Sequence, residues 1–524
     1  MPEMIPIRIP RGGERGDIPD HEQDMTSFRV LSNMLVDNNG RLVLRDGYEK
    51  LATTGPGGRI QGLHYFQTAA AADRTVAANR TQLWTYDGTT WTNRTGGTAL
   101  TASTTQLSRF LTFPISGVYN VLHCNEVDAL QIWNGSAATF SDAGGSPPVV
   151  VDMAEAANRV LALVNPDNIR ISDFNNPEVW PAALTARLTS GDIKIGMEQM
   201  GRLAVGIYGE DSQWIARAQQ GTFPFRFERI DSKPGPLSKA CIVGDGNIHY
   251  YLATDGIIYR NDGVQVLPWS AAMQNYVLAN LNHINRRMAH GVLIRRIKHI
   301  FWFFPSGTAS APNIGVYLDL NLDPRTKVPS RAMGRLAIGE ITASSKWLSV
   351  SLVSWNSLST FTWNNLSATY PTWDSFGGTA ERREIFGDSS GQVHAFGSGD
   401  GSDNGNAIEG IAELPLAPLA GMDKNAIPME FDTWWRKTTN STTVTPRVRV
   451  TDTLAAEPSL INLTSFDLSV DSRKSVDLVS AAGAEGKRFV SVGFQVSATR
   501  GGVEWLGGLL RTEEAEAEAG PTPV

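Results

Sequence analysis

Cysteine is almost absent from this chain. Of 524 residues only two are cysteines, Cys124 and Cys241, and neither has a second cysteine nearby. Two isolated thiols cannot form a disulfide framework, and the absence of C-x-x-C spacing argues against a zinc site. We therefore expect a protein that stays in a reducing compartment, or that does not rely on disulfides.

Long apolar runs and dense charge are missing as well. No stretch approaches 18 consecutive apolar residues, so we expect no transmembrane helix. The first 17 residues carry charge and proline where a signal peptide needs an apolar core, which favours a chain that is made and kept in a cytoplasm. Charged residues make up 19% of the chain, and the net charge of −7 argues against a general nucleic-acid binder, which is usually basic.

Motifs of catalysis are scarce too. The chain has no G-x-S-x-G, H-E-x-x-H, P-loop or G-x-G-x-x-G in a fitting context, and its eight histidines are scattered. Asp87, Asp211, Asp255 and Asp388 stand at predicted strand ends, where aspartate commonly forms turns. We therefore predict that the protein is not an enzyme and holds no cofactor or metal.

What the sequence does contain is a repeat. A short apolar strand followed by an Asn-Gly or Asp-Gly turn recurs at Leu83–Gly88, Leu130–Gly135 and Ile257–Gly263. These dipeptides predict two-residue hairpin turns, because both of their residues readily adopt positive φ. Further short strands lie between the copies, and the period is about 45 residues, which is typical of a β-propeller blade.

We therefore predict an all-β protein with a β-propeller of about 6–8 blades over residues 51–400. A set of β-sandwiches is the competing interpretation, because its strands also recur at short spacing. One inserted helix is expected near 270–288, with Ser270 as a candidate N-cap. Its apolar stripe consists of Met273, Val277, Leu281, Ile284 and Met288. A shorter helix is expected over Gln23–Val36.

The two ends of the chain differ from the repeat. Residues 1–50 are expected to form an N-terminal arm and docking segment. A Gly- and Ser-rich linker covers 397–406, and alternating strands beyond it predict a small β-sandwich over 401–510, with one ring of the Trp434–Trp435 pair in its core. Residues 511–524 are expected to form an acidic tail.

Two groups of basic residues are candidate contact sites. The densest positive stretch predicts contact with DNA or a neighbouring subunit, and consists of Arg286, Arg287, Arg295, Arg296 and Lys298. The simpler interpretation of this stretch is a helix end and a polar strand face. Arg8, Arg11 and Arg15 in the arm are candidates for docking on an adjacent ring.

The order of the motifs resembles the tail nozzle proteins of short-tailed bacteriophages, also called tail tubular protein B or packaged-DNA stabilisation proteins. The resemblance covers most of residues 30–400, and no single motif is diagnostic. It rests on the succession Asn33–Asp37, Gly40–Gly47, Trp84–Trp91, Asn165–Trp180, Asp211–Ile215, Gly235–Ser238, Ala253–Tyr259, Trp302–Pro305 and Gly387–His394.

The resemblance implies a structural virion protein of the tail, assembled in the bacterial host cytoplasm. Members of the family form a homo-hexamer below the portal and the adaptor ring. Genome DNA passes their central channel without sequence readout, and they retain it before ejection. Tail fibres or spikes are candidates for attachment to the outside. The family supplies no catalytic residues to carry over to this chain.

Two other classes remain open. A host-surface propeller that binds glycans, such as a tailspike-type module, would share the predicted fold. A propeller glycoside hydrolase would need paired carboxylates, for which the turn aspartates are the available candidates. Fold alone does not decide among these functions.

Overall fold

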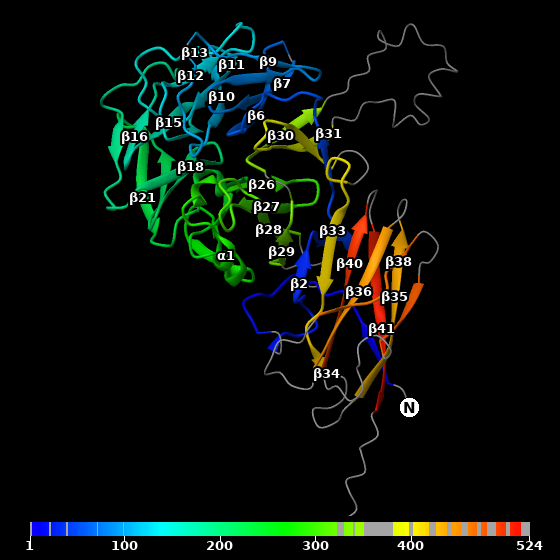
Figure 1. The fold of residues 1–524 in the computed structure, drawn as a ribbon. Coiled ribbons are helices and arrows are strands. Elements are labelled where there is room, and N and C mark those ends of the chain that lie inside the picture. The colour runs from blue at the N-terminus through cyan, green and yellow to red at the C-terminus, as the bar shows by residue number, and fades with distance from the viewer. Residues whose placement is uncertain are drawn as a thin grey trace, which may run out of the picture.

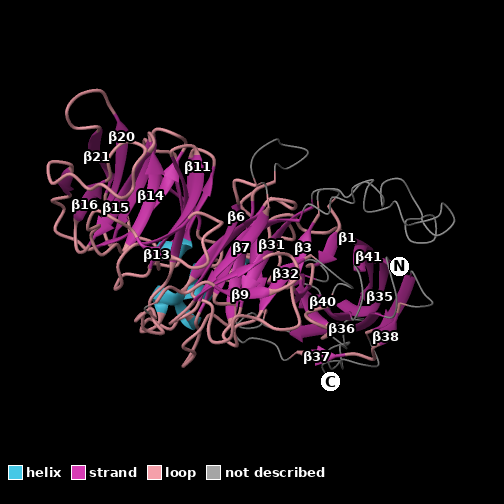
Figure 2. Ribbon diagram, turned by 90° about the horizontal axis from the view of Figure 1, so that it is seen from above, coloured by secondary structure: helices cyan, strands magenta, loops and turns pink. Residues whose placement is uncertain are grey.

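The computed structural model describes residues 3–19, 22–37, 40–70, 72–97, 99–321, 330–338, 341–349, 381–397, 402–418, 426–437, 442–451, 460–468, 473–478, 489–498 and 503–514. These residues form two β domains that lie side by side in both views (Figures 1 and 2). One is a β-propeller and the other is a β-sandwich, so the predicted all-β fold is confirmed.

The propeller consists of seven four-stranded antiparallel units within the described residues, here called blades 1 to 7. Blades 1 to 3 are β6(Gly62–Gln67)–β7(Asp73–Ala78)–β8(Leu83–Tyr86)–β9(Trp91–Asn93), β10(Arg109–Ile115)–β11(Val118–Cys124)–β12(Gln131–Trp133)–β13(Ser141–Asp142) and β14(Asp152–Ala156)–β15(Arg159–Val164)–β16(Asn168–Ile171)–β17(Thr185–Arg187). Blades 4 and 5 are β18(Lys194–Met200)–β19(Ala204–Gly209)–β20(Gln213–Ala218)–β21(Phe225–Asp231) and β22(Ile242–Asp245)–β23(Ile248–Leu252)–β24(Ile258–Asn261)–β25(Val266–Ser270).

Blades 6 and 7 close the ring. They are β26(His290–Ile294)–β27(His299–Phe304)–β28(Ile314–Asp319)–β29(Met333–Leu336) and β30(Ala343–Ser349)–β31(Glu381–Gly387)–β32(Val393–Phe396)–β5(Tyr48–Lys50). The first strand of each blade packs beside the first strand of the next, and β30 packs beside β6. The fourth strand of blade 7 comes from the beginning of the chain, so early and late segments together seal the propeller.

The repeated turn signature occupies one position in the blades. The pairs Asp87–Gly88, Asn134–Gly135 and Asp262–Gly263 each connect the third strand to the fourth, in blades 1, 2 and 5. The predicted two-residue hairpin is wrong, because only the glycine has positive φ (Gly88 at +100°). Asp87 instead accepts hydrogen bonds from the N–H groups of Thr89 and Thr90, which stabilises a longer loop.

The sandwich has two sheets and draws strands from both ends of the chain. One sheet orders β3(Met34–Val36), β4(Leu42–Leu44), β41(Val503–Glu514), β35(Ala426–Lys437) and β39(Arg473–Asp477), with β1(Glu3–Ile7) also on β41. The other contains β33(Ile408–Glu413), β40(Phe489–Ala498), β36(Thr442–Thr451) and β37(Ile461–Asn462), with β34(Ala417–Pro418) on β40 and β38(Phe466–Asp467) on β36.

The core between these sheets is aromatic. Phe494 packs between Trp435 and Trp505, with ring centroids 4.8 and 4.7 Å away. Trp435 is buried, as predicted for one ring of the Trp434–Trp435 pair. Residues 1–50 do not form a separate arm, because they supply β1–β4 to the sandwich and β5 to blade 7. Part of the expected acidic tail belongs to β41, and residues 515–524 lie outside the described part of the chain.

The strand β2(Val30–Ser32) joins the two domains. It pairs in parallel with β29 of blade 6 and antiparallel with β33 of the sandwich, so one sheet runs from the propeller into the sandwich (Figure 1). The helix predicted over Gln23–Val36 is therefore wrong: its apolar residues Phe28, Leu31 and Leu35 are buried, but Leu31 lies on β2 and Leu35 on β3(Met34–Val36). Tertiary pairing has outweighed a helical pattern.

The helix expected near 270–288 exists but is shorter. In the described residues α1(Gln274–Asn280) is the single α-helix. Ser270 ends β25 and does not cap the helix, and Leu281 already has extended backbone. The apolar stripe also breaks, because Ile284 is 92% exposed. Two short 3₁₀ helices are η2(Lys239–Cys241) and η3(Arg286–Met288).

Candidate functional site

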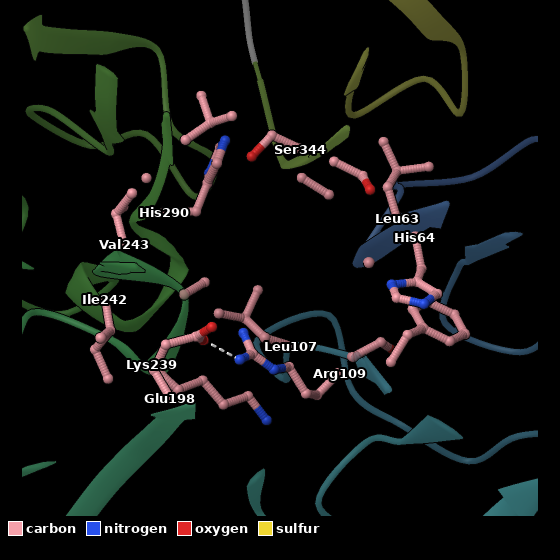
Figure 3. Close-up of a pocket in the computed structure, with 18 of the residues that line it drawn as sticks. Leu63, His64, Leu107, Arg109, Glu198, Lys239, Ile242, Val243, His290 and Ser344 are labelled. Atoms are coloured by element: carbon pink, nitrogen blue, oxygen red, sulfur yellow. Dashed lines mark hydrogen bonds and ion pairs between the residues drawn. The ribbon is translucent and has the colours of Figure 1, made fainter. Parts of the chain in front are cut away.

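A channel runs along the axis of the propeller, with a volume of about 440 Å³. Every blade contributes to its wall, because the first strand of each blade faces the axis. Figure 3 shows its side chains arranged around an open centre. One lining residue from each blade in turn is His64, Arg109, Glu155, Glu198, Val243, His290 and Ser344.

Arg109 ties three blades together at the channel wall. Its guanidinium forms an ion pair with Glu198 of blade 4, and its Nε lies 3.5 Å from Asp152 Oδ1 of blade 3. Asp152 is fully buried, and burial raises the pKa of its carboxyl, while Arg109 and Lys239 oppose that shift. Asp152 Oδ2 also accepts the N–H of Met197 at 2.8 Å. The Arg109 guanidinium is therefore held in the channel wall between the carboxylates of Asp152 and Glu198.

Lys239 makes a second connection of this kind. Its Nζ donates to the carbonyl oxygen of Val151 at 2.5 Å and lies 2.8 Å from Glu126 Oε1. The side chain is almost fully buried, although it comes from the short η2 segment before blade 5. A buried ammonium needs such partners, because an unpaired charge in the interior is costly. Lys239 therefore fixes blade 5 to blades 2 and 3.

The histidines of the channel are neutral near pH 7. Burial lowers the pKa of His64 to about 4, helped by nearby Arg109, and burial lowers the pKa of His290 to about 3, helped by Arg59. His64 Nε2 lies 2.7 Å from Thr112 Oγ1. Histidines whose pKa values lie this far below 7 are poorly matched to acid–base chemistry at neutral pH.

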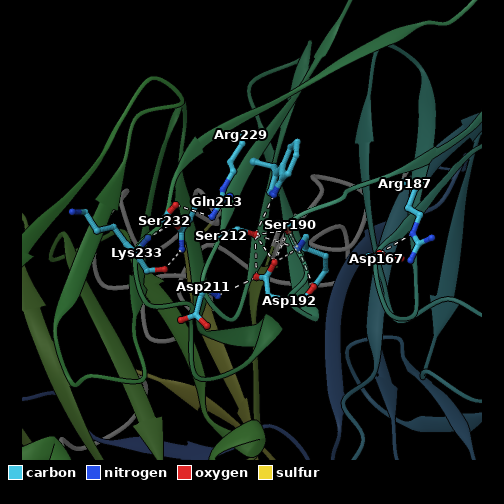
Figure 4. A network of polar contacts seen from close by, with 12 residues as sticks. Asp167, Arg187, Ser190, Asp192, Asp211, Ser212, Gln213, Arg229, Ser232 and Lys233 are labelled. Atoms are coloured by element: carbon cyan, nitrogen blue, oxygen red, sulfur yellow. Dashed lines mark hydrogen bonds and ion pairs between the residues drawn. The ribbon is translucent and has the colours of Figure 1, made fainter.

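A second polar network lies where blade 3 leads into blade 4 (Figure 4). Asp192 accepts from Lys194 Nζ at 2.6 Å, from Ser212 Oγ at 2.9 Å and from the Asp211 N–H at 3.0 Å. These bonds favour the ionised carboxylate and hold its pKa at about 2, against the effect of burial. Trp214 Nε1 donates to Ser212 Oγ at 3.1 Å, which extends the network to β20. These bonds connect the segment before β18 with the loop between β19 and β20, so the network stabilises the structure of blade 4.

The predicted basic cluster is divided by a strand. Arg286 and Arg287 precede β26, whereas Arg295, Arg296 and Lys298 follow it, so the two groups lie at opposite ends of β26. Five residues of strand span about 16 Å. The five residues are therefore close in sequence but form two groups at opposite ends of β26.

Three of these five residues have acidic partners in the same chain. Arg286 lies 3.7 Å from Glu210, Arg295 lies 3.4 Å from Asp245, and Arg296 pairs with Asp46. Arg287 and Lys298 are exposed. Contact of any of them with DNA or a neighbouring subunit stays a prediction.

The arginines expected in a docking arm pack against their own chain. Arg15 forms an ion pair with Asp17 at 2.7 Å, and the Arg11 guanidinium fills the space beside Gly40, where a Cβ would clash. Arg8 follows β1 and is exposed. Docking on an adjacent ring stays a prediction for these residues, with Arg8 the most accessible of the three.

Sequence reasoning missed the channel groups Arg109, Asp152, Glu198 and Lys239. A signal was present, because Arg109 and Asp152 are charged first residues of strands whose next two residues are apolar. Their partners lie on other blades, so no local pattern could pair them. In the described residues, no cluster of three or more His, Cys, Asp or Glu is placed to hold a metal ion, and no helix has the length and apolar character needed to cross a membrane.

Comparisons with known proteins give a likeness in structure alone. No protein-family model and no curated protein matches the chain. Among solved structures it is similar to Raptor from Chaetomium thermophilum, with 8% sequence identity and a TM-score of 0.39. The match covers 67% of this chain and 29% of the Raptor chain, so this chain spans under a third of that protein.

Proposed function

We propose that this chain is the subunit of a phage tail nozzle: a structural virion protein that forms a hexamer below the portal and adaptor, retains the packaged genome and conducts it during ejection. The proposal starts from the order of sequence motifs. The structural observation that carries it is the fixed junction between the propeller and the sandwich, because a wall that withstands packaged DNA needs rigid subunits.

Two buried carboxylates hold this junction. Glu14 is fully buried; it accepts the N–H of Leu31 at 2.9 Å and the Arg335 Nε at 2.7 Å. Glu413 on β33 is also buried; it lies 4.0 Å from Arg29 of the N-terminal segment and 3.2 Å from Arg447 on β36. Together with the shared strand β2, these ion pairs connect the N-terminal segment, blade 6 and the sandwich. Buried pairs of this kind fix one geometry, because breaking either leaves an uncompensated charge.

The charges of the propeller also suit a wall. Arg109 and Lys239 are engaged by carboxylates, so the described wall of the channel offers no free cationic stripe for phosphates. A chain with net charge −7 would let DNA slide, since strong phosphate contacts would hold it. The aspartates that a hydrolase would need are instead used to stabilise turns. The carboxylates of Asp87, Asp255 and Asp388 each accept a backbone N–H group of their own turn.

The oligomeric state tests the proposal. The purified protein, alone and mixed with a portal–adaptor complex, is imaged by negative-stain electron microscopy, and virions are labelled with antibodies against it. We expect sixfold rings, formed on the complex if not alone, and label at the tail. Monomers in both samples together with unlabelled virions would contradict the proposal.

A substitution at the exposed basic positions sharpens this experiment. Arg287→Glu together with Lys298→Glu would weaken rings if these residues contact a neighbouring subunit. Arg226→Glu on β21 is a matched control, because that arginine is also exposed. If rings form equally well with the double variant and the control, the predicted subunit contacts of Arg287 and Lys298 are excluded. That result would not contradict the proposed nozzle function.

A further inference from the structure

A second hollow lies beside the channel, between blades 1 and 2. This groove has a volume of about 540 Å³, and Tyr65 lines both the groove and the channel. It opens where β6 and β10 lead into their first turns. We call it the tyrosine groove; its walls are formed by Tyr65, Gln67, Thr68, Thr112, Gly117 and Tyr119, with Ala69 beside them.

The wall of the groove carries hydrogen-bonding groups and no charge. All seven lining residues are uncharged, although charged residues make up 19% of the chain. The nearby Asp73 carboxylate accepts two hydrogen bonds from residues of the groove. Tyr65 donates its hydroxyl to Asp73 Oδ1, and Gln67 Nε2 donates to the same oxygen at 3.3 Å. These bonds fix the Tyr65 ring and orient the Gln67 amide. The carbonyl oxygen of Gln67 is then available to accept a hydrogen bond from a ligand.

One aromatic ring stands free at the rim. Tyr119 is 54% exposed, so most of one face of its ring is accessible to a ligand. It follows the turn at Gly117, where φ is +82° and a Cβ would meet nothing within 4 Å, so the space beside this glycine is open. Thr68 Oγ1 accepts the N–H of Ala72 at 3.1 Å, which leaves the hydroxyl proton of Thr68 free to donate.

This set of groups identifies a class of ligand. An exposed ring offers a flat apolar face, and the amide and hydroxyl groups offer donors and acceptors without charge. Phosphates and nucleic acids would require cations, and a purely apolar partner would bury the polar groups unpaired. A sugar ring combines a C–H face with neutral hydroxyls. We propose that the tyrosine groove binds a neutral saccharide, with Tyr119 stacked on a sugar ring and Gln67 and Thr68 bonded to its hydroxyls.

The site is independent of the proposed nozzle function, and isolated protein is sufficient to test it. Saturation-transfer NMR would be recorded on the full chain with maltotriose, cellotriose and triacetylchitotriose, each at concentrations up to several times a dissociation constant of about 1 mM. We expect transfer to at least one of these sugars. Tyr119→Ala should weaken that binding at least tenfold, and Gln67→Ala should weaken it by a smaller factor.

A matched variant controls for loss of an exposed ring. Phe174 in blade 3 is 53% exposed, so Phe174→Ala removes a comparable ring from another loop and should leave binding unchanged. Circular dichroism would show that all variants keep the same fold. Absence of transfer to all three sugars, binding that survives Tyr119→Ala, or tighter binding of the acidic trigalacturonate would each overturn the proposal. None of these outcomes would bear on ring formation.

Discussion

The two cysteines occupy similar environments despite their distance in sequence. Cys124 ends β11 and Cys241 ends the η2 segment, and both are buried. Burial raises the pKa of each thiol to about 12, because the thiolate would lose its hydration. We predict that the native protein at pH 8 does not react with Ellman's reagent, whereas both thiols react in guanidinium chloride. Labelling of either thiol within minutes in native buffer would contradict this.

Glu14 gives the domain junction a pH dependence. Arg335, Glu413, Tyr276 and Tyr317 face it, and burial raises its pKa to about 7 although Arg335 opposes the shift. The folded protein therefore keeps a proton on Glu14 that the unfolded chain releases above the ordinary glutamate pKa of 4.5. This contribution to stability is complete below pH 4.5 and is lost as the pH rises to about 7.

We expect the melting temperature of the wild type to fall across that window relative to Glu14→Gln, whose side chain does not titrate. Asp17→Asn is a suitable control. Pairing with Arg15 lowers the pKa of the Asp17 carboxyl, so that residue titrates below the window and should not alter the slope. Calorimetry at several pH values measures the difference. Parallel curves for the wild type and Glu14→Gln would exclude this role of Glu14.

At the scale of elements, the sequence predicts strands well and their partners poorly. The turn dipeptides and apolar runs predicted the strands of blades 1, 2 and 5, because turn residues and alternation are local signals. The pairing of β5 with β32, or of β2 with both β29 and β33, joins residues that are hundreds of positions apart. The channel groups could not be predicted for the same reason: the whole of blade 3 separates Arg109 of blade 2 from Glu198 of blade 4 in the sequence.

The turn loops make a prediction of their own. Asp87 accepts two backbone N–H groups between β8 and β9, so Asp87→Ala should lower the free energy of unfolding by about 1 kcal/mol. Asp211→Ala is the control. Asp211 is exposed, and its side chain is not used by the Asp192 network, so the loss should stay below about 0.5 kcal/mol. Urea unfolding of both variants measures the values, and equal losses would refute the role of the turn carboxylate.

At the scale of the whole molecule, the first 50 residues hold both domains together. Deleting residues 1–7 removes β1, of which Ile7 is buried and Met4 and Pro6 are exposed, and should yield a folded protein with a lower melting temperature. Deleting residues 1–50 also removes β2 and β5, which exposes unpaired edges in blades 6 and 7 and in the sandwich. We expect that longer deletion to aggregate. Thermal denaturation measures the melting temperature, and size-exclusion chromatography detects the aggregation. A monomeric, cooperatively unfolding 51–524 chain would contradict the prediction.

The pairing of β5 with β32 in blade 7 also determines when the propeller can close during translation. β5 leaves the ribosome early, but its partner β32 follows only after residue 393, and β1 must wait for β41 near the end of the chain. At ribosomal rates of roughly 5–20 residues per second, the early strands stay without partners for roughly 20–100 seconds. Blades 1 to 5 use only neighbouring segments and can form during that interval. The nascent chain therefore exposes open strand edges until β41 has been synthesised, so we expect chaperones that bind extended segments to associate with it during that interval.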